Sequence, residues 1–405
     1  MGVKPGQRLD GTRTIKEPAG PPGSNDLREA GRDTERYIFA PMPTSNAPDQ
    51  LVNLQRFEPL AAERLPRMVY DYYAGGAGDE RLLHTAREAW DAIEIRYRVL
   101  RDVSKRSLAT EILGRPHAWP VLVAPMAFQQ LAHPDGELAT ARACATTQTG
   151  MVLSTMATRS VEEVRAAAPG PRWFQLYVYR DRDLTAQLVR RAELAGYDAL
   201  VVTVDAPLLG RRERDLVNGF HVPADTPVPN LSGEPRDLLA AAAPTASALS
   251  AFVDAHWDPA LSWADVAWLR SITSLPILLK GIVRGDDAAL ALDQGVAGVI
   301  VSNHGGRQLD TAVPTARALR EVSSAMAGRG TLLVDGGIRR GTDILKALAL
   351  GAHGVLVGRP VLWGLAVDGE AGVAKVLRLL RDELDLALAL AGCRSLSDIT
   401  PDLIA

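Results

Sequence analysis

This chain of 405 residues has few cysteines, a small net charge and few long apolar runs. Its two cysteines, Cys144 and Cys393, are far apart and in no metal-ligand spacing, which argues against a disulfide scaffold and a cysteine-type zinc site. The net charge of −3 gives no reason to expect nucleic acid or a membrane as a partner. No uninterrupted apolar stretch of about 20 residues occurs, so no transmembrane helix is expected. With no secretory signal pattern at the N-terminus, these absences favour a protein of the reducing cytoplasm.

The first fifty residues differ in composition from the rest of the chain. Residues 1–50 are rich in Pro, Gly, Arg and Asp and lack a sustained apolar period, which predicts a disordered extension. From Leu51 the apolar residues follow a helical spacing, and this helical segment ends at the Gly75–Gly78 turn. Residues 51–405 are therefore expected to form one folded domain.

The remainder of the chain alternates short apolar runs rich in β-branched residues with helical patterns. The predicted strands are Val121–Ala124, Met151–Thr155, Trp173–Val178, Ala199–Val204, Ile277–Leu279, Ala297–Val301, Thr331–Val334 and Gly354–Val357. The predicted helices include Glu137–Gln148, Val161–Ala167, Leu184–Ala195, Asp286–Gln294, Thr315–Ala327 and Gly341–Leu350. Eight strands with helical crossovers indicate an α/β fold, a (β/α)8 TIM barrel rather than an open sheet. Roughly seventy residues separate the fourth and fifth strands, and this insertion, which includes Pro223–Ala255, predicts a lid over the site.

Polar residues cluster at the C-terminal ends of nearly all the predicted strands, the face at which such barrels carry their active sites. The most informative stretch is Ser302–Asp310, which directly follows an apolar strand and contains His304 and Arg307. A histidine can take up a proton near neutral pH, and an arginine three residues later can hold a carboxylate with a bidentate fork. Together they suggest an enzyme that deprotonates a small acid whose carboxylate is clamped.

The ends of strands seven and eight carry the pieces of a phosphate site. Gly336 and Gly337 permit close backbone approach, and Arg339 and Arg359 supply positive charge beside a helix start. Lys280 ends an otherwise apolar strand, which is costly unless its ammonium meets an anion. Spacing alone leaves two partners for it open, a reduced flavin ring and a Schiff-base substrate.

The other histidines carry little signal. His133, His221 and His353 have no carboxylate partner at ligand spacing, so no metal site is expected. A non-redox barrel that only binds a phosphate ligand remains an alternative function. The combination of His304, Asp205 and Arg307 argues against it, because binding alone needs no base.

Ordered blocks of sequence from about Gln50 to Ala405 resemble the FMN-dependent 2-hydroxy acid oxidases, the group of glycolate and lactate oxidases. The matching blocks are Met68–Tyr73, Phe174–Tyr177, Thr203–Pro207, Leu209–Glu213, Leu275–Gly281, Ser302–Asp310, Asp335–Thr342 and Gly358–Pro360. The resemblance implies an FMN-binding barrel that oxidises (S)-2-hydroxy acids to 2-oxo acids, with O2 as electron acceptor and H2O2 as product. The alternative within the family is a dehydrogenase that passes electrons to a quinone or a protein. A homotetramer or homo-octamer is also implied.

The same resemblance implies a role for each matching residue. His304 takes a proton from the substrate, and Asp205 stabilises the resulting imidazolium. Arg212 and Arg307 bind the substrate carboxylate, and Tyr72 and Tyr177 hydrogen-bond the substrate. The residues expected to hold the isoalloxazine ring are Pro125, Met126, Ala127, Ser154, Gln175, Thr203 and Lys280. Those expected to hold the ribityl phosphate end are Ser302, Asp335, Gly336, Gly337, Arg339, Gly358 and Arg359.

Two positions bear on substrate and acceptor. Met156 stands where plant-type glycolate oxidases have a tryptophan beside the substrate, and a flexible methionine should relax the selection of side chains. Lactate and larger 2-hydroxy acids are therefore expected to compete with glycolate. Ala127 is the residue associated with oxidase members of the family, whereas several dehydrogenases have glycine, so it favours O2 as the acceptor.

Overall fold

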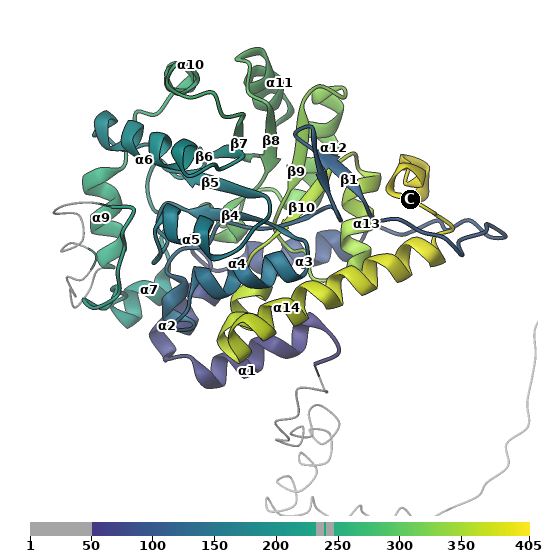
Figure 1. Ribbon diagram of the computed structural model, residues 1–405, viewed down its shortest axis with the longest axis horizontal. Coiled ribbons are helices and arrows are strands. Elements are labelled where there is room, and N and C mark those ends of the chain that lie inside the picture. The colour runs from purple at the N-terminus through teal and green to yellow at the C-terminus, as the bar shows by residue number, and fades with distance from the viewer. Residues whose placement is uncertain (1–50, 232–238, 240–246) are drawn as a thin grey trace, which may run out of the picture. The chain divides into compact units, whose positions relative to one another are not determined.

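The computed structural model describes residues 51–231, 239 and 247–405 of the chain. The extension predicted for residues 1–50 lies outside the described residues, as does part of the predicted lid. In the described part, eight parallel strands close into a barrel in the order β10-β3-β4-β5-β6-β7-β8-β9, with helices around it (Figure 1). The predicted (β/α)8 fold is confirmed.

The predicted strands all lie where the structure has barrel strands. Their bounds are β3 Val121–Val123, β4 Gly150–Ser154, β5 Arg172–Leu176, β6 Ala199–Thr203, β7 Ile277–Ile282, β8 Gly298–Val301, β9 Thr331–Val334 and β10 Gly354–Val357. They are buried on both faces, as their continuous apolar runs require when side chains fill the barrel and helices cover it. The largest difference from prediction is at β7, which continues past Lys280 to Ile282 with a shift of register against β8.

The helices around the barrel are α4 Glu137–Thr146, α5 Val161–Ala167, α6 Arg182–Leu194, α10 Trp263–Ile272, α11 Gly285–Asp293, α12 Thr315–Met326, α13 Gly341–Ala349 and α14 Arg359–Leu390. Capping boxes start α5 at Ser160 and α10 at Ser262, where the side chain and the third helical residue satisfy each other's backbone N–H groups. The six predicted helices are present, whereas α10 and α14 were not predicted. A non-helical step at Asp368 and Gly369 interrupts α14.

Short elements precede the barrel and connect its strands. Before it lie η3 Leu54–Arg56, α1 Phe57–Arg64, α2 Arg67–Ala74, α3 Arg81–Asp91 and the hairpin β1 Thr110–Ile112 with β2 Arg115–His117. The others are η4 Gln129–Leu131, η5 His304–Gly306, η6 Leu396–Asp398, η7 Pro401–Leu403 and, in the predicted lid, α7 Glu213–Asn218 and α9 Ala248–His256. The predicted first helix is broken at Leu65, which is extended because Pro66 follows it. The hairpin was missed because its strands are too short to show a period.

The barrel interior is filled rather than hollow. Aliphatic side chains and Trp173 from all eight strands form an inner cluster, and a larger outer cluster lies between the strands and the helices. Polar chemistry is therefore confined to the ends of the strands. No helix in the described part of the chain is long and apolar enough to cross a bilayer.

Candidate active site

A cavity of about 1120 Å³ opens at the C-terminal ends of the barrel strands. Its walls come from strand ends, from α2 and from the lid. Of the predicted site residues, all line this cavity except Asp205 and Ser302. Each of these two contacts a residue that does line it, since Asp205 bonds His304 and Ser302 bonds Lys280. The predicted residues are thus brought together at one place, while their individual roles stay predictions.

His304 is held in the wall of the cavity by its neighbours. The distance from its Nδ1 to Oδ1 of Asp205 is 2.8 Å, and its backbone N–H donates to Oγ of Ser302 at 3.1 Å. Its φ of +56° lies in the left-handed region, which histidine tolerates better than most residues but which still needs support from its surroundings. With Nδ1 engaged by the carboxylate, Nε2 is the ring nitrogen left to exchange a proton with a ligand.

Opposing effects set the charges of this pair. Burial lowers the pKa of His304, Asp205 partly offsets it, and the positive charges of Lys280 and Arg212 lower it further, so the net shift is downward. Burial by itself raises the pKa of Asp205, but the interaction and hydrogen bond with His304, the charge of Lys280 and a backbone hydrogen bond together outweigh it, and the net shift is again downward. At neutral pH the geometry therefore holds a neutral imidazole, able to accept a proton, beside a charged carboxylate.

Lys280 finds its anion within the protein. Its Nζ lies 3.0 Å from Oδ2 of Asp335 and donates to Oγ of Ser302 at 2.9 Å. Burial lowers the pKa of Lys280, but Asp335 and Asp205 outweigh it and raise the pKa overall. A protonated ammonium cannot attack a carbonyl, so the arrangement favours an electrostatic role over a Schiff base.

The register shift in β7 brings Lys280 and Asp205 to the same site. It is centred on Gly281, whose φ is +113°, a conformation that side chains rarely adopt. A Cβ atom at Gly281 would lie 2.5 Å from Cβ of Asp205. Glycine is therefore required where β7 passes the partner of His304, a constraint that no sequence period indicates.

A row of polar groups crosses the ends of β4, β5 and β6. The side-chain oxygen of Gln175 accepts from Oγ of Ser154 at 3.2 Å, and its amide nitrogen donates to Oγ1 of Thr203 at 2.9 Å. Because each strand contributes one polar group near its C-terminal end, the row is suited to the edge of a flat, polar ring. Pro125, Met126 and Ala127, after β3, line the same cavity.

Two arginines lie at the lid side of the cavity, the buried Arg212 and the half-buried Arg307. Arg212 is 6% exposed, and burial together with the charge of Arg307 lowers its pKa to about 10. Nη1 of Arg307 donates to the carbonyl oxygens of Tyr72 and Gly75, at 2.5 and 3.0 Å, and its guanidinium lies 4.9 Å from the centre of the Tyr72 ring. Within residues 51–231, 239 and 247–405, neither arginine has a carboxylate within 4.0 Å. Unpaired cations of this kind are expected to bind an anionic ligand.

A second pair of cations stands at the ends of β9 and β10. Arg359 donates to the carbonyl oxygens of Tyr73 and Gly305, each at 2.9 Å, and burial together with Arg307 and Arg339 lowers its pKa to about 9. Burial likewise lowers the pKa of Arg339. In the described part of the chain neither of these two has a carboxylate partner within 4.0 Å. The charge is placed where the sequence predicts a phosphate.

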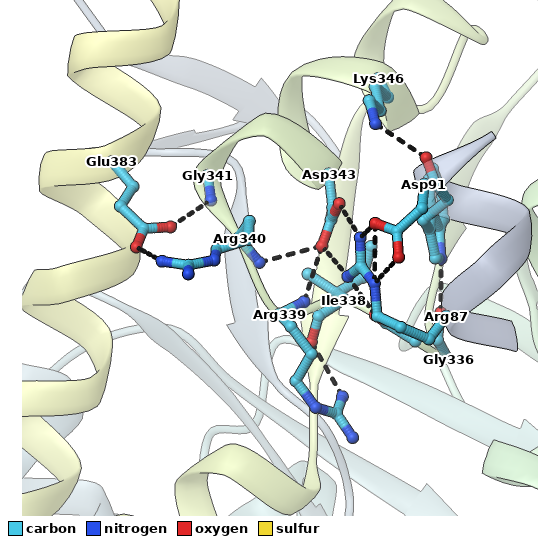
Figure 2. Close-up of polar contacts among 12 residues, drawn as sticks. Arg87, Asp91, Gly336, Ile338, Arg339, Arg340, Gly341, Asp343, Lys346 and Glu383 are labelled. Atoms are coloured by element: carbon cyan, nitrogen blue, oxygen red, sulfur yellow. Dashed lines mark hydrogen bonds and ion pairs between the residues drawn. The ribbon is translucent and has the colours of Figure 1, made fainter. Parts of the chain in front are cut away.

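The loop that carries Arg339 is held by a charged network (Figure 2). The buried carboxylate of Asp343 accepts from the backbone N–H groups of Arg339 and Arg340, at 2.8 and 2.9 Å. It also accepts from both terminal nitrogens of Arg87 in α3, one of which donates to the carbonyl oxygen of Gly337 at 3.1 Å. Trp90, also in α3, donates to the carbonyl oxygen of Gly336 at 2.8 Å.

No pattern in the sequence indicates this role of α3. α3 also packs closely against Gly337, where a Cβ atom would come within 2.8 Å of the carbonyl oxygen of Ala86, while Gly337 itself lines the cavity. Trp257 and Leu249, from the lid, were missed as well, although both line the cavity. His133, His221 and His353 do not line it.

The fold and the site define a barrel enzyme with a large cavity for an anionic cofactor and an acidic ligand. Residues 61–405 match the family model described as FMN-dependent dehydrogenase. The chain is 53% identical over 350 residues to Glycolate oxidase 3 of Oryza sativa subsp. indica, which covers 86% of this chain and 95% of that protein. It is 52% identical over 352 residues to an L-lactate oxidase of Nostoc sp., covering 86% and 96% of the two chains. A solved structure of mandelate oxidase with (S)-4-hydroxymandelic acid matches with a TM-score of 0.84 and 43% identity, over 87% of this chain and 98% of that one. The chain belongs to the FMN-dependent dehydrogenase family.

FMN is accordingly the cofactor, and the residues present fit it. Arg339 and Arg359 offer unpaired positive charge for a phosphate, at the end of the barrel where β9 and β10 terminate. Oδ1 of Asp335 is buried and has no hydrogen-bond partner among the described residues, so it can accept from a cofactor hydroxyl group. The polar row centred on Gln175 suits the ring end.

Proposed function

We propose that this protein oxidises (S)-2-hydroxy acids to 2-oxo acids, with O2 as the electron acceptor and H2O2 as the second product. The observation that carries the proposal is the His304–Asp205 pair beside Arg212 and Arg307, which have no carboxylate partner among the described residues. A base and a carboxylate clamp in one cavity are what deprotonation of a small hydroxy acid requires. The names of the relatives, glycolate oxidase, L-lactate oxidase and mandelate oxidase, support the same reaction class.

The chain's own residues supply binding, orientation and proton transfer. Arg212 and Arg307 hold the substrate carboxylate, which fixes the hydroxyl-bearing carbon relative to the base. His304 accepts a proton from the substrate at Nε2, and the charge of Asp205 stabilises the imidazolium that forms. When FMN is bound in this cavity, it would supply the redox chemistry, as the acceptor of the substrate's two electrons and their donor to O2.

Two finer points rest on the family resemblance and the sequence. A homotetramer or homo-octamer is the expected assembly, and two buried, unpaired cysteines suit a reducing compartment such as the cytoplasm. Ala127, which lines the cavity, favours O2 over a quinone or protein acceptor.

The function is tested by the absorbance of the purified protein. We expect a yellow protein whose flavin bands bleach when (S)-lactate is added without oxygen and return when air is admitted, with one H2O2 formed per 2-oxo acid. Reduction by the acid without reoxidation in air would support the alternative dehydrogenase. A protein that takes up no FMN, or whose FMN no 2-hydroxy acid reduces, would contradict the proposal.

Met156 is expected to relax substrate selection. Its side chain is 2% exposed and lines the cavity, with Sδ lying 3.8 Å from the hydroxyl oxygen of Tyr179. Met156→Trp should shift preference toward glycolate by shrinking the pocket, with a change of about 10- to 100-fold in the ratio of kcat/KM values for lactate and glycolate as the ceiling. Steady-state kinetics with both acids check this. An unaltered ranking would place the selection elsewhere in the cavity.

A further inference from the structure

Trp257 stands at the junction between the lid and the barrel. It directly follows α9, is 5% exposed, and its ring stacks on that of Tyr177 with centroids 3.7 Å apart and planes 21° apart. The backbone around it pairs with the segment after β5: Arg180 N–H donates to the carbonyl of His256 at 2.9 Å, and Asp258 N–H to that of Val178 at 3.2 Å. The indole is therefore held on two sides, by the stack and by the main chain.

Behind this ring lies a second cavity, of about 1280 Å³. It lies outside the barrel wall, between β6, β7 and α10, because residues such as Val202, Leu279 and Val266 line it and belong to the outer hydrophobic cluster. Most of its walls are aliphatic. Two carboxylates also line it: Asp258 is engaged by Arg182, and Asp287 belongs to the first turn of α11.

The two cavities share three lining residues, Tyr177, Thr203 and Trp257. Thr203 is at the end of β6 and its hydroxyl accepts from Gln175, so it belongs to the barrel wall itself. Beyond the end of β6, the stacked rings of Tyr177 and Trp257 separate the two cavities. The indole is thus a partition between an active-site cavity and an apolar space that no predicted role uses.

Part of the lining of the first cavity is apolar. Leu209 and Leu249 line it, as does Met156, whose sulfur contacts Tyr179. Tyr179 is the residue that forms the backbone bridge to Trp257. Met156 and Trp257 are thereby two walls of one apolar corner, well suited to the side chain of a 2-hydroxy acid whose carboxylate is held by arginine.

We propose that Trp257 is a specificity-determining residue, which sets the largest substrate side chain by closing the active site toward the second cavity. The second cavity is then a latent site for the distal methylenes of a straight-chain 2-hydroxy acid, because its walls are aliphatic. This inference rests on the proposed oxidation of 2-hydroxy acids. It assigns the size limit to the lid side of the cavity, next to the wall formed by Met156.

The test compares Trp257→Ala with Trp257→Phe in the FMN-loaded protein. Anaerobic stopped-flow reduction by (S)-lactate and by (S)-2-hydroxyoctanoate gives a rate constant and an apparent Kd for each acid. Trp257→Ala should raise the preference for 2-hydroxyoctanoate over lactate by about 10- to 100-fold, the range that a few methylenes of contact allow. Trp257→Phe should keep most of the partition and change the preference far less.

A second substitution fills the new space. Val266 in α10 lines the second cavity but not the first, so Val266→Phe alone should leave lactate oxidation unaltered. Combined with Trp257→Ala it should abolish the gain for 2-hydroxyoctanoate. A gain that survives in the double variant would overturn the assignment of the second cavity.

Binding without turnover separates this inference from the proposed function. Titration with 2-oxooctanoate, followed through the flavin absorbance, should show tighter binding in Trp257→Ala than in the native protein, whether or not either is reduced by a hydroxy acid. If the native flavin is not reduced by any 2-hydroxy acid but this binding tightens, the proposed function fails and the partition stands. Unaltered preference and binding in Trp257→Ala, or equal losses for short and long acids, would overturn the role of Trp257.

Discussion

His304→Gln is expected to keep FMN bound while slowing flavin reduction by (S)-lactate by about 10²–10⁴-fold. The reason is that glutamine cannot accept the substrate proton, while the residues that line the phosphate end and the polar row around Gln175 are untouched. Anaerobic stopped-flow absorbance at saturating lactate measures the loss, and the flavin content of the purified variant is its control. Near-normal reduction in His304→Gln would show that another group is the base.

The pH profile gives this prediction a second, independent readout. Only neutral His304 accepts a proton, so kcat/KM should fall as the pH falls through the pKa of the ring. Burial lowers that pKa, so the acid limb should lie below about 6.5, the ordinary histidine value. Asp205→Asn removes the charge that raises the pKa, and should therefore move the acid limb to still lower pH while also lowering the rate. If the acid limb of the kcat/KM profile moved to higher pH in Asp205→Asn, the electrostatic pairing of Asp205 with His304 would be contradicted.

Arg87→Ala is expected to lower the free energy of unfolding by about 3 kcal/mol and to weaken FMN binding. The side chain of Asp343 is fully buried, and removal of Arg87 leaves its charge with backbone N–H partners alone. The loop that carries Arg339 should then lose its fixed position. Denaturant unfolding of the apoprotein and titration of its refolded form with FMN, followed by flavin fluorescence, measure the two effects.

Matched variants separate loop positioning from general stability. Arg98→Ala breaks an ion pair whose side chains are 52% and 58% exposed, and should change stability by less than about 1 kcal/mol with no effect on FMN binding. Arg87→Lys keeps the positive charge but loses the paired hydrogen bonds of the guanidinium. Compared with Arg87→Ala, it should recover more of the lost stability than of the lost FMN affinity. If Arg87→Ala is destabilised but binds FMN as tightly as the native apoprotein, the network supports the fold without positioning the phosphate loop.

Local patterns in the sequence were sufficient to place the barrel and the open end of its site. Strands buried on both faces are continuous apolar runs, and helices that cover a core repeat every three to four residues, so both are visible without knowledge of the tertiary structure. Because parallel strands all end at one face, residues as far apart as Gln175 and Arg359 could be assigned to one site before any coordinates existed. The short hairpin before β3 was missed because strands of three residues are too short to show a periodic pattern. The break at Leu65 was missed because Pro66 ends the helix although the apolar spacing continues past it.

What the tertiary structure alone decided is which side chains meet across elements. The partner of Lys280 is Asp335, the support of Arg339 comes from Arg87 in α3, and the partition beside Tyr177 is Trp257 of the lid. None of these contacts has a fixed sequence separation, since each depends on how a helix or a lid packs against the ends of the strands. The sequence by itself therefore determined the fold, the face and the residue types of the site, because these follow from local periodicity and from the common direction of parallel strands. The charges that remain unpaired and the limits of the cavity depend on packing between distant segments, and only the folded chain determines them.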